Sequence, residues 1–263
     1  MDRHLQASGE LCHVLAEDVE LADAIPPANR EQATQECLCR MIAVPAGLWR
    51  ASQVASPREG IGLLVTQGLL IRRVGVDGRF GSELLGAGDL LRPWQGEDEP
   101  PTLPVTTGWQ VIEPTRIAVL DEQFARCLAR YPQLTGRLVA RALGRARNLA
   151  VNMAIVHQAR VDVRLHMLFW HLAGRWGRVR SDCVSLPLRL THNVLADLAA
   201  ARRPTVTSAL SELAKLGLVH QNDEGWLLSG RPPGELLELG VVPPAVSFAS
   251  EPSQRRNADV GVG

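Results

Sequence analysis

The side chains best suited to chemistry lie between residues 190 and 228, where two short segments with apolar periodicity are separated by a turn. Arginine can form two hydrogen bonds to guanine, and serine and threonine hydroxyls bind phosphates or base edges. The candidate residues of this kind are Thr191, Arg202, Arg203, Thr205, Thr207, Ser208 and Ser211. Their types and spacing predict recognition of double-stranded DNA, and we expect all seven to be DNA-binding.

These side chains need two helices to position them. Thr191 is a good N-cap for a first helix, and Pro204 is tolerated in the first turn of a second helix, which Gly217 would end. Small residues, Ala196 and Ala209, stand where the two helices would cross. Two short apolar runs around residues 222–225 predict a two-stranded wing, so the whole is a winged helix-turn-helix whose second helix enters the major groove. A helical hairpin that contacts only protein is the alternative.

A long helix of roughly 25 residues, about 38 Å, is predicted after the break at Tyr131-Pro132. Apolar and small residues recur along it at alternating steps of four and three, which is a heptad seam. The seam consists of Thr135, Val139, Ala142, Ala146, Leu149, Met153 and Val156. We expect all of these except Thr135, the first position, to form a homodimer interface. A helix lying on its own domain is the alternative, and a second apolar line (Leu138, Leu143, Ala150) indicates packing on two sides.

The segment from Gly60 to Leu120 has the character of short strands and turns. Gly68 splits one apolar run, Asp77-Gly78 is a strong hairpin sequence, and Pro114 separates two further strands. Several short strands at this spacing predict a sandwich or barrel.

The order of these parts, with Gly68, Asp77-Gly78 and the turn from Leu85 to Asp89, resembles the Crp/Fnr transcriptional regulators over roughly residues 40–230. The resemblance implies an α+β fold with a jelly-roll-like N-terminal β-roll sensor domain, a long dimerisation helix and a C-terminal winged helix-turn-helix. The implied divisions are an N-terminal extension (1–39), a cyclic-nucleotide-binding-like β-roll (40–130), the dimerisation helix (131–158), the DNA-binding domain (159–230) and a flexible tail (231–263).

Within the resemblance, Arg203 matches the arginine that commonly opens the recognition helix and reads a guanine, and Thr205-Val206 matches the usual pair after it. Pro204 replaces a base-reading glutamate, Ser208 replaces a second arginine, and Ala200 replaces the turn glycine. The operator should therefore differ from the family's best-known palindrome.

Relatives that bind cyclic AMP carry a Gly-Glu-Leu stretch and an Arg-Ser or Arg-Thr after the Gly-Asp turn, and neither follows Asp89 here. Prolines in this stretch remove amide donors, and the acids at 97–99 would repel a phosphate. We therefore expect that the protein binds no cyclic nucleotide and that Arg92 is an ordinary surface arginine.

Some relatives in this family ligate an iron–sulfur cluster through clustered cysteines, so the cysteines here are candidates for such a site. The five, Cys12, Cys37, Cys39, Cys127 and Cys183, lack the usual Cys-x₂-Cys run, and their irregular spacing does not predict a disulfide framework. We expect ordinary buried or idle thiols. No histidine pair suits a metal, so neither a cofactor nor a metal is expected.

The formal net charge is zero, but the charges are unevenly distributed. Residues 1–125 hold 10 basic and 18 acidic residues, whereas residues 126–180 hold 11 arginines and one acid, Asp162. Part of this basic excess could steer the protein to DNA phosphates, and we expect Arg137, Arg141 and Arg145 to meet the acidic sensor domain across the dimer.

These observations predict a homodimeric, sequence-specific transcription regulator that binds a pseudo-palindromic operator, with RNA polymerase as a further candidate partner. The alternative is a signalling adaptor whose roll binds a metabolite or protein and whose winged helix does not read DNA. No catalytic constellation has recognisable spacing, so we expect no enzyme. No apolar run is long enough to span a bilayer and no signal core opens the chain, so we expect a cytoplasmic protein without membrane contact.

Overall fold

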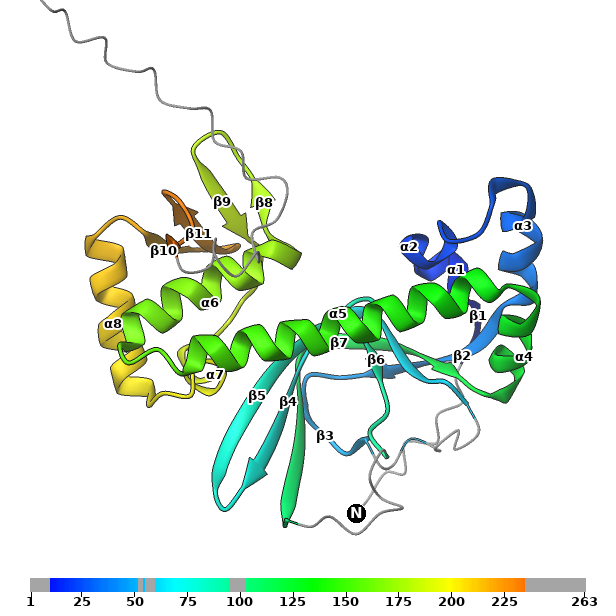
Figure 1. Ribbon diagram of the computed structural model, residues 1–263, viewed down its shortest axis with the longest axis horizontal. Coiled ribbons are helices and arrows are strands. Elements are labelled where there is room, and N and C mark those ends of the chain that lie inside the picture. The colour runs from blue at the N-terminus through cyan, green and yellow to red at the C-terminus, as the bar shows by residue number, and fades with distance from the viewer. Residues whose placement is uncertain (1–9, 52–53, 55–59, 95–102, 235–263) are drawn as a thin grey trace, which may run out of the picture.

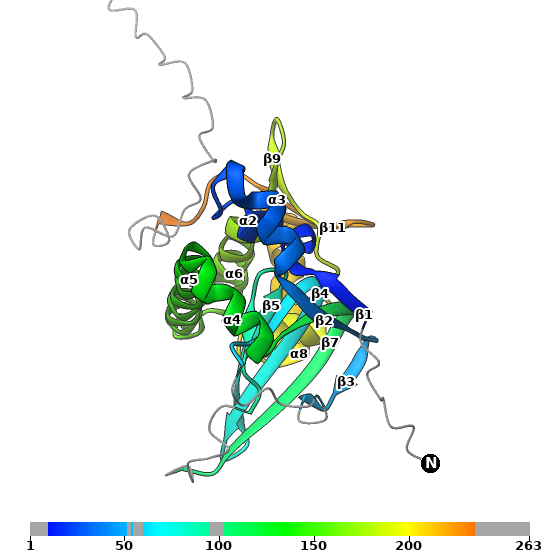
Figure 2. The ribbon, with the colours of Figure 1, turned by 90° about the vertical axis from the view of Figure 1, so that its right-hand side faces the viewer.

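The computed structural model describes residues 10–51, 54, 60–94 and 103–234. A β-roll and a helical, wing-bearing part lie along one long helix, α5 (Pro132–Val156) (Figure 1). In Figure 2, viewed from the end that carries the first helices, α5 lies on one side of the strands. The predicted α+β architecture is confirmed, with the roll before the helix and the helix-turn-helix after it.

Within the described residues, the roll is one seven-stranded antiparallel sheet. Its main path, in spatial order, is β1 (Glu10–His13), β2 (Leu38–Val44), β7 (Val105–Leu120), β4 (Gly62–Val76) and β5 (Arg79–Gly86). Two short strands lie off this path: β3 (Gly47–Trp49) pairs with β7, and β6 (Leu90–Leu91) pairs with β4. The interior is filled by side chains such as Leu63, Leu70 and Ile117, so the roll encloses a packed core.

Gly68 and Pro114 do not divide their strands, contrary to the prediction of separate short strands. β4 and β7 each run through, and the register shifts between Val65 and Leu70. Gly68 has φ +95°, and a Cβ there would lie 2.5 Å from the Pro114 carbonyl oxygen. The two residues therefore face each other at an irregularity, where a proline without an N–H and a glycine without a side chain are both accommodated.

The Asp77-Gly78 hairpin is confirmed. Both residues have positive φ, +50° and +73°, as a type I′ turn requires, and they join β4 to β5.

The segment predicted to be an extension, residues 1–39, is folded from residue 10 onward. β1 pairs with β2, and three helices follow: α1 (Val14–Glu17), α2 (Val19–Ala22) and α3 (Pro27–Glu36). Val14 and Leu21 are fully buried in one cluster with Phe124, Leu134 and Leu138. This unit has only a weak sequence pattern, because its helices are short and cover only one end of the roll.

Two of the cysteines are paired, which corrects the expectation of idle thiols. Cys37, at the end of α3, forms a disulfide with Cys127 of α4 (Glu122–Arg130). Cys12 and Cys39 are directly opposite each other on β1 and β2, with their sulfurs 3.6 Å apart. Burial raises the pKa of both thiols, so they are poor nucleophiles at neutral pH. The disulfide joins residues 90 positions apart, a pairing that spacing alone could not reveal.

The arginines of α5 bind acids of their own chain, which corrects the prediction of contacts across a dimer. Arg141 forms two hydrogen bonds with Asp18, at 2.6 and 2.8 Å, and a third with Glu20 at 2.8 Å. Arg145 binds Glu83 through two hydrogen bonds of 2.6 and 2.8 Å. These ion pairs hold one face of α5 against the roll and the N-terminal helices.

The remaining elements form the reading domain, which we define as residues 161–229. It comprises α6 (Val161–Trp176), α7 (His192–Leu198) and α8 (Arg203–Lys215), with strands β8 (Arg178–Val179), β9 (Cys183–Leu186), β10 (Val219–Asn222) and β11 (Gly225–Ser229). The strands form one sheet in the order β10-β11-β9-β8, so the predicted two-stranded wing is part of a four-stranded sheet. The sequence did not predict β9, because the strand has only four residues and pairs with the distant β11.

Candidate nucleic-acid interface

The turn between α7 and α8 sets the angle of the second helix. Ala200 has φ +47°, the left-handed conformation that favours glycine, and the Ala201 amide donates to the Ala196 carbonyl at 2.9 Å. Arg164 of α6 donates to the carbonyls of Ala199 and Ala200 at 3.2 and 3.3 Å. Arg164, which was not predicted from the sequence, therefore stabilises the turn through these two hydrogen bonds.

The two helices cross on small and branched apolar residues. Ala196 and Ala209 are both buried, as predicted, beside Val206. Phe169 of α6 packs against Trp226 of β11 with ring centroids 4.9 Å apart, which fixes the wing sheet against the helices.

The first turn of α8 presents its charges to solvent. Arg202, at the N-cap, and Arg203, the first helical residue, are exposed, and the guanidinium group of neither forms a hydrogen bond or ion pair with another residue of the described ranges. The helix N-terminus adds its own partial positive charge. This end of α8 thus carries two unneutralised guanidinium groups suited to an anionic, hydrogen-bonding surface.

The predicted hydroxyl groups lie on the same exposed surface, but several already donate within the helix. The hydroxyls of Thr207, Ser208 and Ser211 donate to the carbonyls of Arg203, Pro204 and Thr207, at 3.1, 3.2 and 3.1 Å. Their oxygens still have lone pairs that can accept from a base or backbone donor. Thr205 is exposed, and its hydroxyl forms no hydrogen bond with another described residue.

Thr191 is the N-cap of α7, as predicted, and its hydroxyl oxygen accepts from the Val194 amide at 3.3 Å. His192 was not predicted as part of this surface. Its Nδ1 lies 2.9 Å from the Thr207 hydroxyl, so it links the start of α7 to the exposed face of α8.

A second feature that the sequence did not reveal is the ion pair between Arg73 of β4 and Asp197 of α7. The Arg73 Nε donates to Asp197 at 2.9 Å, and a second guanidinium nitrogen contacts the same carboxylate oxygen. Leu69, Ile71 and Leu84 of the roll belong to the same hydrophobic cluster as the reading domain. The reading domain is thus docked on the roll through both apolar and ionic contacts.

The outward face of α5 is apolar. Val139, Leu143 and Met153 are 52%, 66% and 62% exposed, with Ala146 and Ala150 between them. Ala142 also lies on this face, whereas Leu149 and Val156 are half-buried towards their own chain. The second apolar line is divided: Leu138 is buried against the N-terminal unit, while Leu143 and Ala150 face outward.

The comparisons with known proteins agree with this geometry. Residues 163–229 match the model of the Crp-like helix-turn-helix domain. The chain is a DNA-binding transcription regulator with a Crp-like reading domain. The domain match, together with the fold, is consistent with a Crp/Fnr regulator, as the sequence resemblance implied. No curated protein matches the sequence.

Solved structures share the fold at low sequence identity. A cyclic nucleotide-binding domain containing protein from Listeria monocytogenes EGD-e is 13% identical, with a TM-score of 0.59 over 81% of this chain and 96% of that one. FixK2 from Bradyrhizobium japonicum is 16% identical, with a TM-score of 0.53 over 76% and 96%. A CooA mutant from Carboxydothermus hydrogenoformans is 18% identical, with a TM-score of 0.53 over 76% and 87%.

Two further observations bear on the other sequence predictions. Among the described residues, no cluster of three or more histidine, cysteine or acidic side chains is arranged to hold a metal, and no helix is long and apolar enough to cross a membrane. The segment that argued against cyclic nucleotides lies partly outside the described ranges, as does the tail beyond residue 234. The expectations for those two segments stay predictions.

Proposed function

We propose that the regulator acts as a homodimer on a pseudo-palindromic operator, by binding rather than by catalysis. The observation that carries this proposal is the combination of two surfaces on one chain: the free arginines at the start of α8 and the apolar outward face of α5. An exposed row of Val139, Leu143 and Met153 along a long helix supports packing against a second copy of that helix. Such a dimer would present two recognition helices to successive turns of DNA.

Within this proposal, Arg203 reads a guanine and Arg202 binds a phosphate. Arg203 is the first residue of α8, where the recognition helix of such a domain meets base edges, while Arg202 lies outside the helix. Thr191, Thr205, Thr207, Ser208 and Ser211 fix the position of the helix through phosphate or base contacts.

The operator is found by selection from random DNA and then tested by electrophoretic mobility shift at physiological salt. We expect a pseudo-palindrome with half-sites about 10 base pairs apart, centre to centre. Equal affinity for selected and scrambled DNA would overturn the proposal and favour the adaptor alternative.

Dimerisation is tested separately by analytical ultracentrifugation. Leu143→Glu places a charge in the centre of the apolar face and should give a monomer. The matched control is Leu48→Glu, because Leu48 of β3 is a leucine of still greater exposure, 90%, far from α5. A Leu143→Glu protein that stays dimeric would show that this face is not the interface.

A further inference from the structure

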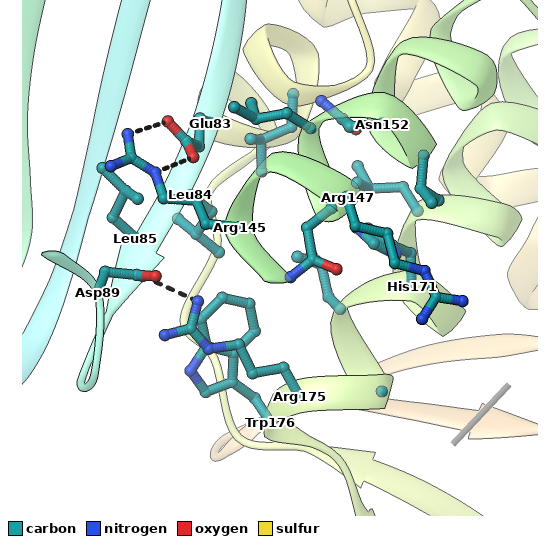
Figure 3. Close-up of a pocket in the computed structure, with 17 residues that line it drawn as sticks. Glu83, Leu84, Leu85, Asp89, Arg145, Arg147, Asn152, His171, Arg175 and Trp176 are labelled. Atoms are coloured by element: carbon teal, nitrogen blue, oxygen red, sulfur yellow. Dashed lines mark hydrogen bonds and ion pairs between the residues drawn. The ribbon is translucent and has the colours of Figure 1, made fainter. Parts of the chain in front are cut away.

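A cavity of about 310 Å³ lies between the roll, α5 and the reading domain (Figure 3). Glu83 and Asp89 of its wall are bound by Arg145 of α5 and Arg175 of α6, and His171 also lines it. These ion pairs hold the roll against both helices. No cysteine lines the cavity, so the reactive sulfurs of the chain lie elsewhere.

A pair of thiols lies at the end of the roll that carries the first helices (Figure 1). Cys12 of β1 and Cys39 of β2 are directly opposite each other on adjacent antiparallel strands, and their Sγ atoms are 3.6 Å apart. Opposite residues of such strands have Cα atoms about 4.5–5.5 Å apart, within the range of about 4.4–6.8 Å that a disulfide spans. A bond between these sulfurs, about 2.05 Å long, therefore requires side-chain rotation but no rearrangement of the strands.

The two thiols differ in their access to solvent. Cys12 is half-buried, whereas Cys39 is 2% exposed. Burial raises the pKa of both thiols, and for Cys12 the hydrogen bond with Cys39 and the charge of Arg116 act in the opposite direction. Because Cys12 is only partly exposed and interacts with the acids Glu10 and Glu17, the oxidant that suits it is small and not anionic. Cys12 is therefore the sulfur that such an oxidant reaches first.

The nearest other cysteines already form a disulfide. Cys37 and Cys127 are bonded to each other and belong to the same hydrophobic cluster as Cys39, against which Cys12 packs. The third free cysteine, Cys183, lies in β9 of the reading domain. Cys39 is thus the thiol placed to react with an oxidised Cys12.

We propose that Cys12 and Cys39 form a second, reversible disulfide when the protein meets hydrogen peroxide or another small, uncharged hydroperoxide. Sγ of Cys12 attacks one peroxide oxygen and the O–O bond breaks; the released hydroxide takes the proton that Cys12 gave up, and Cys12 becomes a sulfenic acid. Sγ of Cys39 then attacks Sγ of Cys12, the S–O bond breaks, and the Cys39 proton leaves with the hydroxyl group as a second water. Two thiols lose two electrons and two protons, and one peroxide is reduced to two waters.

The two steps differ in rate. Because burial keeps most of the Cys12 thiol protonated at neutral pH, the first step is slow. The second step joins two sulfurs that are already adjacent, so it is fast by comparison. The pair therefore responds to sustained exposure to peroxide. The bond closes a loop that contains α1, α2 and α3, and it ties the edge strand β1 to the roll. None of this depends on DNA binding.

The pairing is tested by treating the folded full-length protein with hydrogen peroxide, blocking the remaining thiols in denaturant and mapping the peptides by mass spectrometry. Before treatment we expect three free thiols, at Cys12, Cys39 and Cys183. After treatment we expect a link between Cys12 and Cys39, with the disulfide of Cys37 unchanged. Cys183→Ser is the matched control, because it removes a cysteine outside the pair and should give the same link in the same yield.

Three results of this mapping would overturn the proposal. They are a link between any other two of these cysteines, a bond through Cys12 or Cys39 to a second chain, and a treated protein in which Cys12 and Cys39 stay unlinked.

The order of the steps is tested with dimedone, which labels sulfenic acids. Cys39→Ser leaves Cys12 without a reaction partner, so we expect dimedone to label Cys12. Cys12→Ser leaves only the buried thiol, and we expect labelling of Cys39 to be at least about tenfold slower. Equal rates, or faster labelling of Cys39, would contradict the order. If a serine variant does not fold, brief peroxide treatment of the unaltered protein with dimedone present shows which sulfur carries the label.

Reversibility is tested by titrating the oxidised protein with dithiothreitol. We expect the thiols of Cys12 and Cys39 to return before those of Cys37 and Cys127, because the latter two are 0% and 7% exposed and Cys12 is half-buried. A link that persists after the disulfide of Cys37 has opened would refute a reversible site.

Discussion

Replacing Ala200 with glycine should stabilise the protein, because the residue occupies a left-handed conformation with φ +47° in the turn between α7 and α8. An L-residue there is strained by roughly 1–2 kcal/mol relative to glycine. A glycine also gives the unfolded chain more conformational entropy, which offsets about 0.4–1 kcal/mol of the relieved strain. The Ala200 methyl is exposed, so its removal sacrifices little packing. The expected net effect of Ala200→Gly is a gain of about 0.5–1 kcal/mol in the free energy of unfolding.

The assay is urea unfolding of the full-length protein followed by circular dichroism, with Ala201→Gly as the matched control. Ala201 is the next residue, has no positive φ and packs partly against the hydrophobic cluster of the reading domain. Its replacement should destabilise by about 1 kcal/mol, from a lost methyl contact and added backbone entropy. The two glycine variants should therefore shift the midpoint in opposite directions. If Ala200→Gly destabilises as much as Ala201→Gly, the reasoning from backbone strain is wrong.

Three further predictions use the same kinds of measurement. Cys127→Ala removes the disulfide to Cys37 and should lower the free energy of unfolding by about 2–4 kcal/mol under oxidising conditions, whereas Cys183→Ala should not; equal effects would mean that the disulfide is not formed in solution. His171 is neutral when folded but has an ordinary pKa when unfolded, so the unfolded state binds more protons between about pH 4 and 6.5 and stability falls as the pH drops through that window. Its cavity also holds Glu83, Asp89 and three arginines, so the effect is isolated by comparing the midpoints at pH 5 and 7.5 with those of His171→Leu, which should lose less on acidification; an equal loss would contradict the assignment. Arg203→Ala should weaken operator binding by about 1–3 kcal/mol and relax specificity at one base, and an equal loss on all DNA sequences would instead indicate a phosphate contact.

The roll was predictable where turn chemistry is local. Asp77-Gly78 specifies a tight hairpin by its own backbone preferences, and the structure has that hairpin. The continuity of β4 and β7 was not predictable, because Gly68 and Pro114 look like strand breakers until each is seen opposite the other. Which irregularities coincide depends on strand register, and register is a property of the folded sheet.

The candidate interface shows the same division. The cap at Thr191, the helix opened by Arg203-Pro204 and the end near Gly217 follow from local backbone chemistry, so the sequence located the recognition helix well. The support from Arg164 and the ion pair between Arg73 and Asp197 join residues 35 or more positions apart. Contacts of that separation leave no periodic pattern in the chain.

What the sequence determined by itself is the order of the parts and the type of reading domain, because periodicity, caps and turn residues act over a few positions. What only the tertiary structure decided is where the charges are used. The arginine-rich segment 126–180 looked like an electrostatic partner for another molecule or subunit, yet Arg141 and Arg145 are bound by Asp18 and Glu83 of the same chain. Ion pairing requires that side chains be within a few ångströms of each other, and folding alone brings residues 18 and 141 together. Arg202 and Arg203 have no such partner within the described ranges, and they lie where the protein would meet DNA.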